Sequence, residues 1–261
     1  MSNRIHPSAC IDPGAELGRD NVIGPFVHIE AGVRVGDGNR IEAHAVLRRG
    51  TVLGDANRLA EHAVLGGPPQ DLGFDPAIES AVQIGHRNVL REGVTIHRAS
   101  RPGEATRIGD DNYLMVNAHL GHDCRLGDRV IIAVGTALGG FVEVEDRAFI
   151  SGGVMIHQFA RVGRLAMIGG NAKITRDVPP FCLADGLPAR IRGLNVVGLK
   201  RAGLDMQQLR SLKRAYRTLF RSAAPLEEAL AALEALADPQ VRHLAEFLRA
   251  SKRGFHRDRE A

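Results

Sequence analysis

The chain has 261 residues, of which 44% are hydrophobic and 25% are charged, enough to bury one large domain or a domain with an extension. Aromatic residues make up only 4% and tryptophan is absent, whereas 30 glycines indicate many tight turns or a strict repeat. The formal net charge is +4, and because no aromatic side chains alternate with the basic ones, the composition argues against a nucleic-acid platform.

The first residues, MSNRIHPSACIDPG, contain no apolar run. No stretch of about 18 apolar residues occurs, so neither a signal peptide nor a membrane span is predicted, and we expect a cytoplasmic protein. The cysteines Cys10, Cys124 and Cys182 are odd in number and widely spaced. Their spacing predicts neither a zinc pattern nor a disulfide framework.

A six-residue period runs through most of the chain. Aliphatic residues occupy every sixth position over residues 5–65, 84–96 and 108–174, and all 26 of these hexads are led by Ile, Leu or Val. The fourth residue after a leader is usually small, as at Asn21 and Cys124. Such a strict period is typical of a repeat protein.

A helix with 3.6 residues per turn cannot place every sixth residue on one face, but a coil of three short strands can. Each hexad then forms one flat side, with its leader pointing inward and the small residue near the corner. Three hexads make an 18-residue coil, and coils stacked about 4.8 Å apart form a prism on the order of 40 Å long. We therefore predict a parallel β-helix over residues 1–187.

Two polar segments interrupt the period. Residues 66–83, GGPPQDLGFDPAIESAVQ, form the first insertion. Residues 98–107, RASRPGEATR, form the second, which replaces about one hexad. Loops on a rigid solenoid are natural places for binding groups.

After the stretch DVPPF the period stops, and a C-terminal α-helical domain is predicted over residues 188–261. Asp205 and Gln208 have capping-box spacing ahead of an apolar helix face. Pro225 suits a first helical position, and Asp238 followed by a proline suits the start of another helix. We expect two or three helices to close one end of the prism.

The stretch VNAHLGHDC contains the strongest catalytic candidate, His122, which faces outward as the third residue of its hexad. On a coil of three hexads, Gly140 and Gln158 stack above it. A glycine beside a histidine leaves room for a substrate atom and exposes a backbone N–H, as a general base next to an oxyanion donor requires. Asp123 could orient the imidazole. The alternative is an ordinary surface histidine, and Cys124 is expected to pack at a corner.

A metal site would need three ligands that converge on one ion. His97, His119, His122 and His157 are available, but their spacing does not match the three-histidine pattern of hexapeptide carbonic anhydrases. We therefore expect no metal.

Several stretches together resemble one family. NAHLGHDC, QDL, REGVTIHR, IHQF, DVPP and GLKR are similar to the bacterial UDP-N-acetylglucosamine O-acyltransferase that begins lipid A synthesis. The resemblance covers nearly the whole chain and implies a left-handed parallel β-helix and a homotrimer with sites between adjacent prisms. It also implies transfer of a 3-hydroxyacyl chain from acyl carrier protein to the 3-hydroxyl of UDP-N-acetylglucosamine. No cofactor is implied, because the acyl group arrives on the phosphopantetheine of acyl carrier protein.

The resemblance further implies residue roles. His122 would be the general base, Asp123 its support, and the Gly140 backbone N–H the oxyanion donor. Gly170 matches the position where residue size limits acyl length, so glycine there would allow a longer chain. The remaining substrate contacts would fall at Gln70, Asp71, His119, His157, Gln158, Asn195 and Arg201.

Three positions depart from the family pattern: Gly73 stands where lysine is usual after QDL, Phe141 where histidine follows the oxyanion glycine, and Val197 where an acidic residue precedes GLKR. These departures leave open a paralogue that acts on another UDP-amino sugar. Met115 and Met167 would line the acyl groove or simply pack in the core.

Other functions also stay open on this fold, namely a coenzyme A-dependent acetyltransferase, a non-catalytic trimer and a metal-dependent hydratase. The basic C-terminal half would suit the acidic acyl carrier protein as a partner.

Overall fold

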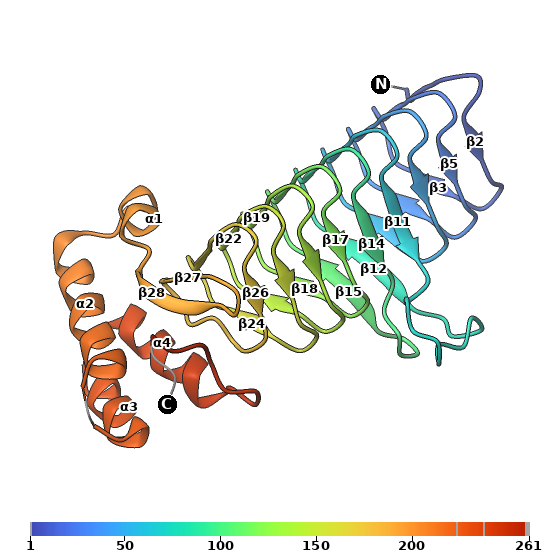
Figure 1. Cartoon of the computed structure of the whole chain (residues 1–261). Coiled ribbons are helices and arrows are strands. Elements are labelled where there is room, and N and C mark those ends of the chain that lie inside the picture. Colours follow the sequence, from blue (N-terminus) through green and yellow to red (C-terminus); the bar gives the residue numbers. More distant parts are fainter. Residues whose placement is uncertain (1, 223, 237, 259–261) are drawn as a thin grey trace.

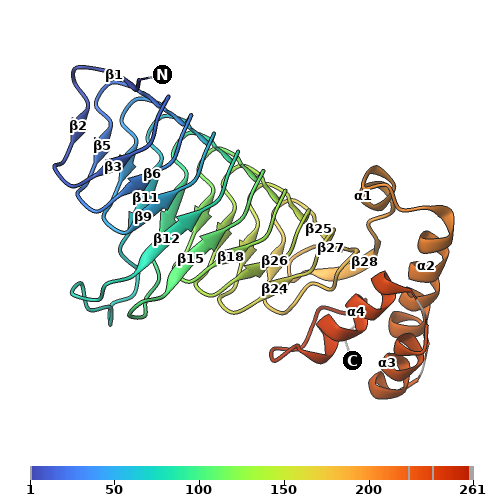
Figure 2. The ribbon, with the colours of Figure 1, turned by 180° about the vertical axis from the view of Figure 1, so that it is seen from behind.

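The computed structural model describes residues 2–222, 224–236 and 238–258. A long prism of short strands occupies the N-terminal two-thirds of the chain, and four helices gather beyond its C-terminal end (Figures 1 and 2). No helix within the described residues is both long and apolar enough to span a lipid bilayer.

Along the prism, each strand pairs with the strand three places later in the chain, so the prism has three faces. The first sheet contains β1 (Arg4–Ile5), β4 (Val22–Ile23), β7 (Arg40–Ile41), β10 (Arg58–Leu59), β13 (Val89–Leu90), β16 (Tyr113–Leu114), β19 (Ile131–Ile132), β22 (Phe149–Ile150), β25 (Met167–Ile168), β27 (Cys182–Asp185) and β28 (Arg190–Leu194). The second contains β2 (Cys10–Ile11), β5 (His28–Ile29), β8 (Val46–Leu47), β11 (Val64–Gly67), β14 (Thr95–His97), β17 (His119–Leu120), β20 (Ala137–Leu138), β23 (Met155–Ile156) and β26 (Lys173–Ile174). The third contains β3 (Glu16–Leu17), β6 (Arg34–Val35), β9 (Thr51–Leu53), β12 (Ala81–Ile84), β15 (Ala105–Ile108), β18 (Arg125–Leu126), β21 (Glu143–Val144) and β24 (Arg161–Val162).

The strand register gives the length of each coil. Ile132 pairs with Ile150, the leader three hexads further along the chain, as the period predicts. Leu53 pairs with Ile84, and Ile84 in turn pairs with Ile108, so these two coils are longer than the regular one. The first insertion lengthens its coil by slightly more than two hexads. The second lengthens its coil by six residues, the length of one hexad.

The two insertions lie side by side and protrude from the same part of the prism (Figures 1 and 2). β11 and β12 extend into the ends of the first insertion, which leaves residues 68–80 outside strands, and β15 extends into the second, which leaves 98–104. The N–H of Gly103 donates to the carbonyl of Glu79 over 2.9 Å, which ties the two segments together.

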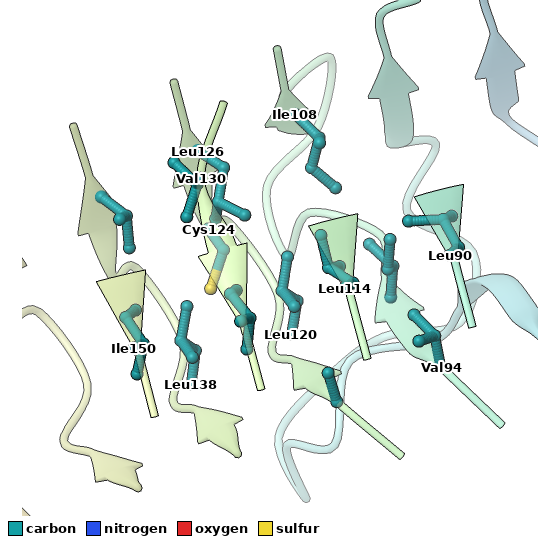
Figure 3. Close-up of a cluster of buried hydrophobic side chains, with 14 of the residues drawn as sticks. Leu90, Val94, Ile108, Leu114, Leu120, Cys124, Leu126, Val130, Leu138 and Ile150 are labelled. Carbon is teal, nitrogen blue, oxygen red and sulfur yellow. The ribbon is translucent and has the colours of Figure 1, made fainter. Parts of the chain in front are cut away.

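The hexad leaders form the core of the prism. Leu90, Leu114, Leu120 and Ile150 are fully buried, and their side chains point into the interior (Figure 3). Cys124 is buried in the same core, as its corner position predicts. Each buried leader removes apolar surface from water, and burial of a whole aliphatic side chain stabilises the fold by about 1.5–3 kcal/mol.

Replacing Ile132 with alanine is expected to lower the free energy of unfolding by about 2–5 kcal/mol, because its side chain is fully buried and truncation leaves a cavity. The matched control is Ile5→Ala, since Ile5 leads its own hexad at the N-terminal end but is 44% exposed. Urea denaturation of the three proteins measures both effects. A loss as large for Ile5 as for Ile132 would contradict burial of leaders as the source of stability.

The C-terminal segment forms α1 (Val196–Arg201), α2 (Met206–Phe220), α3 (Leu226–Glu234) and α4 (Pro239–Arg249). The expected boundary after residue 187 falls inside the hairpin between β27 and β28. The capping box of Asp205 and Gln208 is confirmed at the start of α2, and Asp238 caps α4 with its proline in the first turn. Pro225 is the N-cap of α3, so this helix begins one residue later than predicted, and α1 was not predicted.

The helices share a second apolar core with the end of the prism. Phe181, which directly precedes β27, packs into the same cluster as buried residues of α2, α3 and α4. His243 of α4 also bonds Glu145 of the prism through Nε2 over 2.8 Å. Burial raises the pKa of Glu145, but this hydrogen bond and the charges around it outweigh burial, so the pKa lies below its usual value.

Candidate active site

His122 and Asp123 form a hydrogen-bonded pair in the turn between β17 and β18. The Nδ1 atom of His122 lies 2.7 Å from Oδ2 of Asp123, and the two side chains are 15% and 8% exposed. An ionised carboxylate can only accept a hydrogen bond, so Nδ1 carries the proton. The lone pair of Nε2 is then left to accept a proton from elsewhere.

The second insertion and β15 hold Asp123 in place. The backbone N–H of Ser100 donates to the same Oδ2 atom over 2.9 Å, and the backbone N–H of Asp123 donates to the Thr106 hydroxyl over 2.8 Å. Asp123 has φ of 61°, a left-handed conformation that this turn requires. Sequence reasoning missed both partners. Thr106 could have been found, because it lies exactly three hexads before Cys124, whereas Ser100 is displaced by the insertion.

Gly140 lies directly against His122, as the period of three hexads predicts. A Cβ atom on Gly140 would stand 2.6 Å from both Nε2 and Cε1 of His122, closer than any real contact. Within the part of the chain that the structure describes, the backbone N–H of Gly140 donates to no protein acceptor. The imidazole therefore lies against the backbone of Gly140, whose N–H is left for a further acceptor.

An aromatic column flanks the imidazole. The ring of Phe141 meets the ring of His122 edge to face, with centroids 5.2 Å apart, and stacks on Phe159 at 4.7 Å. The guanidinium of Arg101 lies 5.1 Å from the centre of the Phe141 ring. Phe159 and Arg101 were not predicted as site residues, although Phe159 lies one coil after Phe141 and the period could have placed it.

His119 precedes the pair on β17 and has its own partners. Its Nδ1 atom shares a hydrogen bond of 2.8 Å with the Thr95 hydroxyl, and its ring lies edge-on to that of His97. His97 donates from Nδ1 to the carbonyl of Pro68 over 2.5 Å. Burial, followed by the nearby His97, lowers the pKa of His119 and so favours the neutral imidazole.

Other predicted substrate contacts are exposed and, among the described residues, form no hydrogen bond with the His122–Asp123 pair. Gln70 and Asp71 are exposed in the first insertion, where Asp71 accepts from the N–H of Gly73 over 2.9 Å. His157 and Gln158 are exposed in the turn after β23, and Nδ1 of His157 donates to the carbonyl of Gln158 over 3.0 Å. The register places Gln158 one coil beyond Gly140.

Gly170 is exposed in the turn after β25, and a Cβ there would meet only the Gly152 carbonyl oxygen at 3.5 Å, an ordinary contact. Met167 and Met115 are both half-buried. A larger residue at position 170 would therefore fit the backbone without displacing it.

Asn195 and Arg201 lie in and beside α1, beyond the C-terminal end of the prism and away from β17 (Figure 1). Asn195 caps α1 by accepting from the N–H of Gly198 over 3.0 Å, and its amide donates to the Leu165 carbonyl over 2.9 Å. Within one chain, the Asn195 side chain therefore holds the start of α1 against the backbone at Leu165. Arg201 is exposed, as is Val197, at 61%.

Two family models match the chain. One, described as UDP-N-acetylglucosamine O-acyltransferase, Domain 2, matches residues 177–256, and the other, bacterial transferase hexapeptide (six repeats), matches residues 14–49 and 105–140. The acyl-[acyl-carrier-protein]--UDP-N-acetylglucosamine O-acyltransferase of Thermodesulfovibrio yellowstonii is 44% identical over 98% of this chain and 100% of its own length. The enzyme of the same name from Alkalilimnicola ehrlichii is 43% identical over 97% of this chain and 99% of its own.

Solved structures also superpose on nearly the whole chain. The UDP-N-acetylglucosamine acyltransferase of Bacteroides fragilis superposes with a TM-score of 0.93 at 37% identity, over 96% of this chain and 99% of that one. The one from Campylobacter jejuni has a TM-score of 0.93 at 37% identity, over 98% and 100%. The left-handed parallel β-helix is thereby confirmed. The chain belongs to the UDP-N-acetylglucosamine O-acyltransferase family.

Proposed function

We propose that the protein transfers a 3-hydroxyacyl chain from acyl carrier protein to the 3-hydroxyl of UDP-N-acetylglucosamine, with His122 as general base. The observation that supports this most is the contact of the His122 imidazole with Gly140, whose N–H is unpaired among the described residues. Relatives that align over nearly the whole chain are named acyl-[acyl-carrier-protein]--UDP-N-acetylglucosamine O-acyltransferase.

In this mechanism Nε2 of His122 takes the proton of the sugar hydroxyl as the hydroxyl oxygen attacks the thioester carbonyl carbon. The carbonyl oxygen becomes an oxyanion and accepts a hydrogen bond from the Gly140 N–H. Collapse of the tetrahedral intermediate breaks the carbon–sulfur bond, and the imidazolium returns its proton to the departing pantetheine thiolate. A positioned base contributes about 10²–10⁴-fold and one oxyanion donor about 10²–10³-fold.

Asp123 keeps His122 ready for this role. Its carboxylate holds the proton on Nδ1 and stabilises the imidazolium that forms in the transition state. The Ser100 N–H restrains the carboxylate, so the imidazole does not have to be reoriented when the substrate arrives.

The active form is a homotrimer in which a second prism completes each site. Val134, Met155 and Phe159 are large apolar residues that are 45–53% exposed in the coils next to His122. A neighbouring prism would cover them and bring its own exposed residues next to the His122–Asp123 pair. Sedimentation should then give three times the 28.1 kDa chain mass.

The substrates are held by exposed groups together with the half-buried His119, which precedes the His122–Asp123 pair on β17. Gln70, Asp71, His119, His157 and Gln158 contact the sugar nucleotide, and Arg201 contacts a phosphate. Asn195 supports that contact as the cap of α1. The exposed basic side chains of α2 dock the acidic acyl carrier protein, which carries the acyl chain on its phosphopantetheine; they are Arg210, Lys213, Arg214 and Arg217.

Gly170→Met is expected to shift the acyl preference toward shorter chains, because the new side chain fills space beside the groove. The ratio of kcat/KM for long over short acyl chains should fall by about tenfold or more, since one methylene in an apolar pocket changes kcat/KM by roughly 10–200-fold. Rates with a series of acyl carrier protein thioesters measure this ratio. An unchanged ratio would place the acyl chain elsewhere.

A comparison of donors tests the function as a whole. Purified protein is offered the same acyl group on acyl carrier protein and on coenzyme A, with UDP-N-acetylglucosamine as acceptor. We expect the carrier-protein thioester to be strongly preferred. Preference for acetyl-coenzyme A would instead indicate an acetyltransferase. Turnover only with another UDP-amino sugar would indicate a paralogue. Phe141, which stands where the family has histidine, favours this second alternative.

A further inference from the structure

Cys10, Asp12 and His28 form a cluster of metal-ligand side chains on the first two coils. Oδ1 of Asp12 lies 3.6 Å from Nε2 of His28 and 4.0 Å from Sγ of Cys10. The three ligand atoms all lie within 4.8 Å of one another. A thiolate, a carboxylate and an imidazole together are a donor set that zinc prefers.

The strand register fixes this cluster. Cys10 of β2 pairs directly with His28 of β5, so their side chains stand next to each other on the outer face. Asp12 lies two residues after Cys10 and projects from the same side, because alternate residues of a strand share a face. The backbone therefore places all three groups together without any side chain from an insertion or a helix.

The cluster is separate from the catalytic pair. β2 and β17 belong to the same sheet but are five strand steps apart, on the order of 24 Å. Cys10 is the exposed cysteine of the chain, whereas Cys124 and Cys182 are buried. Among the described residues, Asp12 forms no ion pair with a lysine or arginine, so its carboxylate is not engaged by a competing cation.

From this geometry we propose that Cys10, Asp12 and His28 bind a divalent transition metal of the Zn²⁺ class. Tetrahedral bond lengths of about 2.0–2.3 Å require ligand atoms roughly 3.3–3.7 Å apart. The observed separations exceed these values by at most about 1.5 Å, which rotation of partly exposed side chains can close. The fourth position is open to water. Bound metal would link the first coil to the second at the open end of the prism.

Calorimetric titration of the full chain with Zn²⁺, in a reductant that does not bind metal, should show one equivalent bound at these residues. Binding displaces the thiol proton, so the measured heat should depend on the ionisation enthalpy of the buffer. Titration with Co²⁺ should produce the charge-transfer absorption of a cobalt–thiolate bond. This band reports directly on the thiolate of Cys10, the exposed cysteine, in the unchanged chain.

Cys10→Ser, Asp12→Asn and His28→Gln should each weaken Zn²⁺ binding by more than about tenfold, since even outer-sphere changes cost roughly 10–100-fold. The matched control is His62→Gln, an exposed histidine outside the cluster, which should bind as the unchanged chain does. Absence of the cobalt–thiolate band, or equal Zn²⁺ affinity in all four variants, would overturn the proposal. Circular dichroism confirms that each variant folds.

Discussion

Replacing His122 with alanine is expected to lower kcat by about 10²–10⁴-fold while leaving KM for the sugar nucleotide nearly unchanged. The imidazole holds a free Nε2 lone pair beside Gly140 and is the group that we expect to accept the hydroxyl proton. Steady-state rates with an acyl carrier protein thioester give both constants. Because the side chain is not part of the buried core, circular dichroism and the denaturation midpoint should match those of the unchanged protein.

Asp123→Asn is the companion to this variant, since it keeps the shape of the side chain but removes its charge. An asparagine amide can donate to Nδ1 and thereby place the ring proton on Nε2, which leaves no base. The loss should again appear in kcat. If His122→Ala retained most of the activity, another residue would have to be the base.

Gly140→Ala is expected to lower kcat by about 10²–10³-fold, because the added methyl group would stand 2.6 Å from the His122 ring and displace it. The displaced ring would no longer face the acceptor hydroxyl, and the methyl group would occupy space needed by the thioester carbonyl. Rates and the denaturation midpoint, measured together, separate this local effect from a loss of fold.

The matched control is Gly193→Ala in β28, where an added Cβ meets no atom within 4 Å. This variant should retain activity and stability. Equal activity in the two alanine variants would mean that Gly140 does not lie at the reacting centre.

The period of six predicted the prism because it is a rule about spacing alone. Every leader from Ile23 onward could be assigned to the interior, and His122, Gly140 and Gln158 to one column, by counting in steps of three hexads. Such counting needs no knowledge of side-chain contacts, since the backbone repeats. The capping box of α2 was equally local and was confirmed.

Counting fails where the chain leaves the period. The second insertion adds one hexad to its coil, so Ser100, which holds Asp123, does not lie at the regular spacing from it. α1 is six residues long and begins at an asparagine cap that the apolar pattern does not reveal. Cys10, Asp12 and His28 have no zinc-like spacing in sequence, and only their strand register brings them together.

The roles of the exposed residues stay predictions for a physical reason. Few contacts within one chain involve Gln70, Asp71, His157 and Gln158. Their roles therefore depend on contacts with a substrate and a neighbouring prism. His122, by contrast, already contacts Asp123 and Phe141 within one chain.

The most direct test of acyl transfer at His122 is identification of the product by mass spectrometry and nuclear magnetic resonance. Purified protein, acyl carrier protein loaded with a mixture of 3-hydroxyacyl chains, and UDP-N-acetylglucosamine should give one ester at the 3-hydroxyl of the sugar, and the His122→Ala protein should give almost none. An acyl group on another atom, or the same yield from both proteins, would contradict the mechanism.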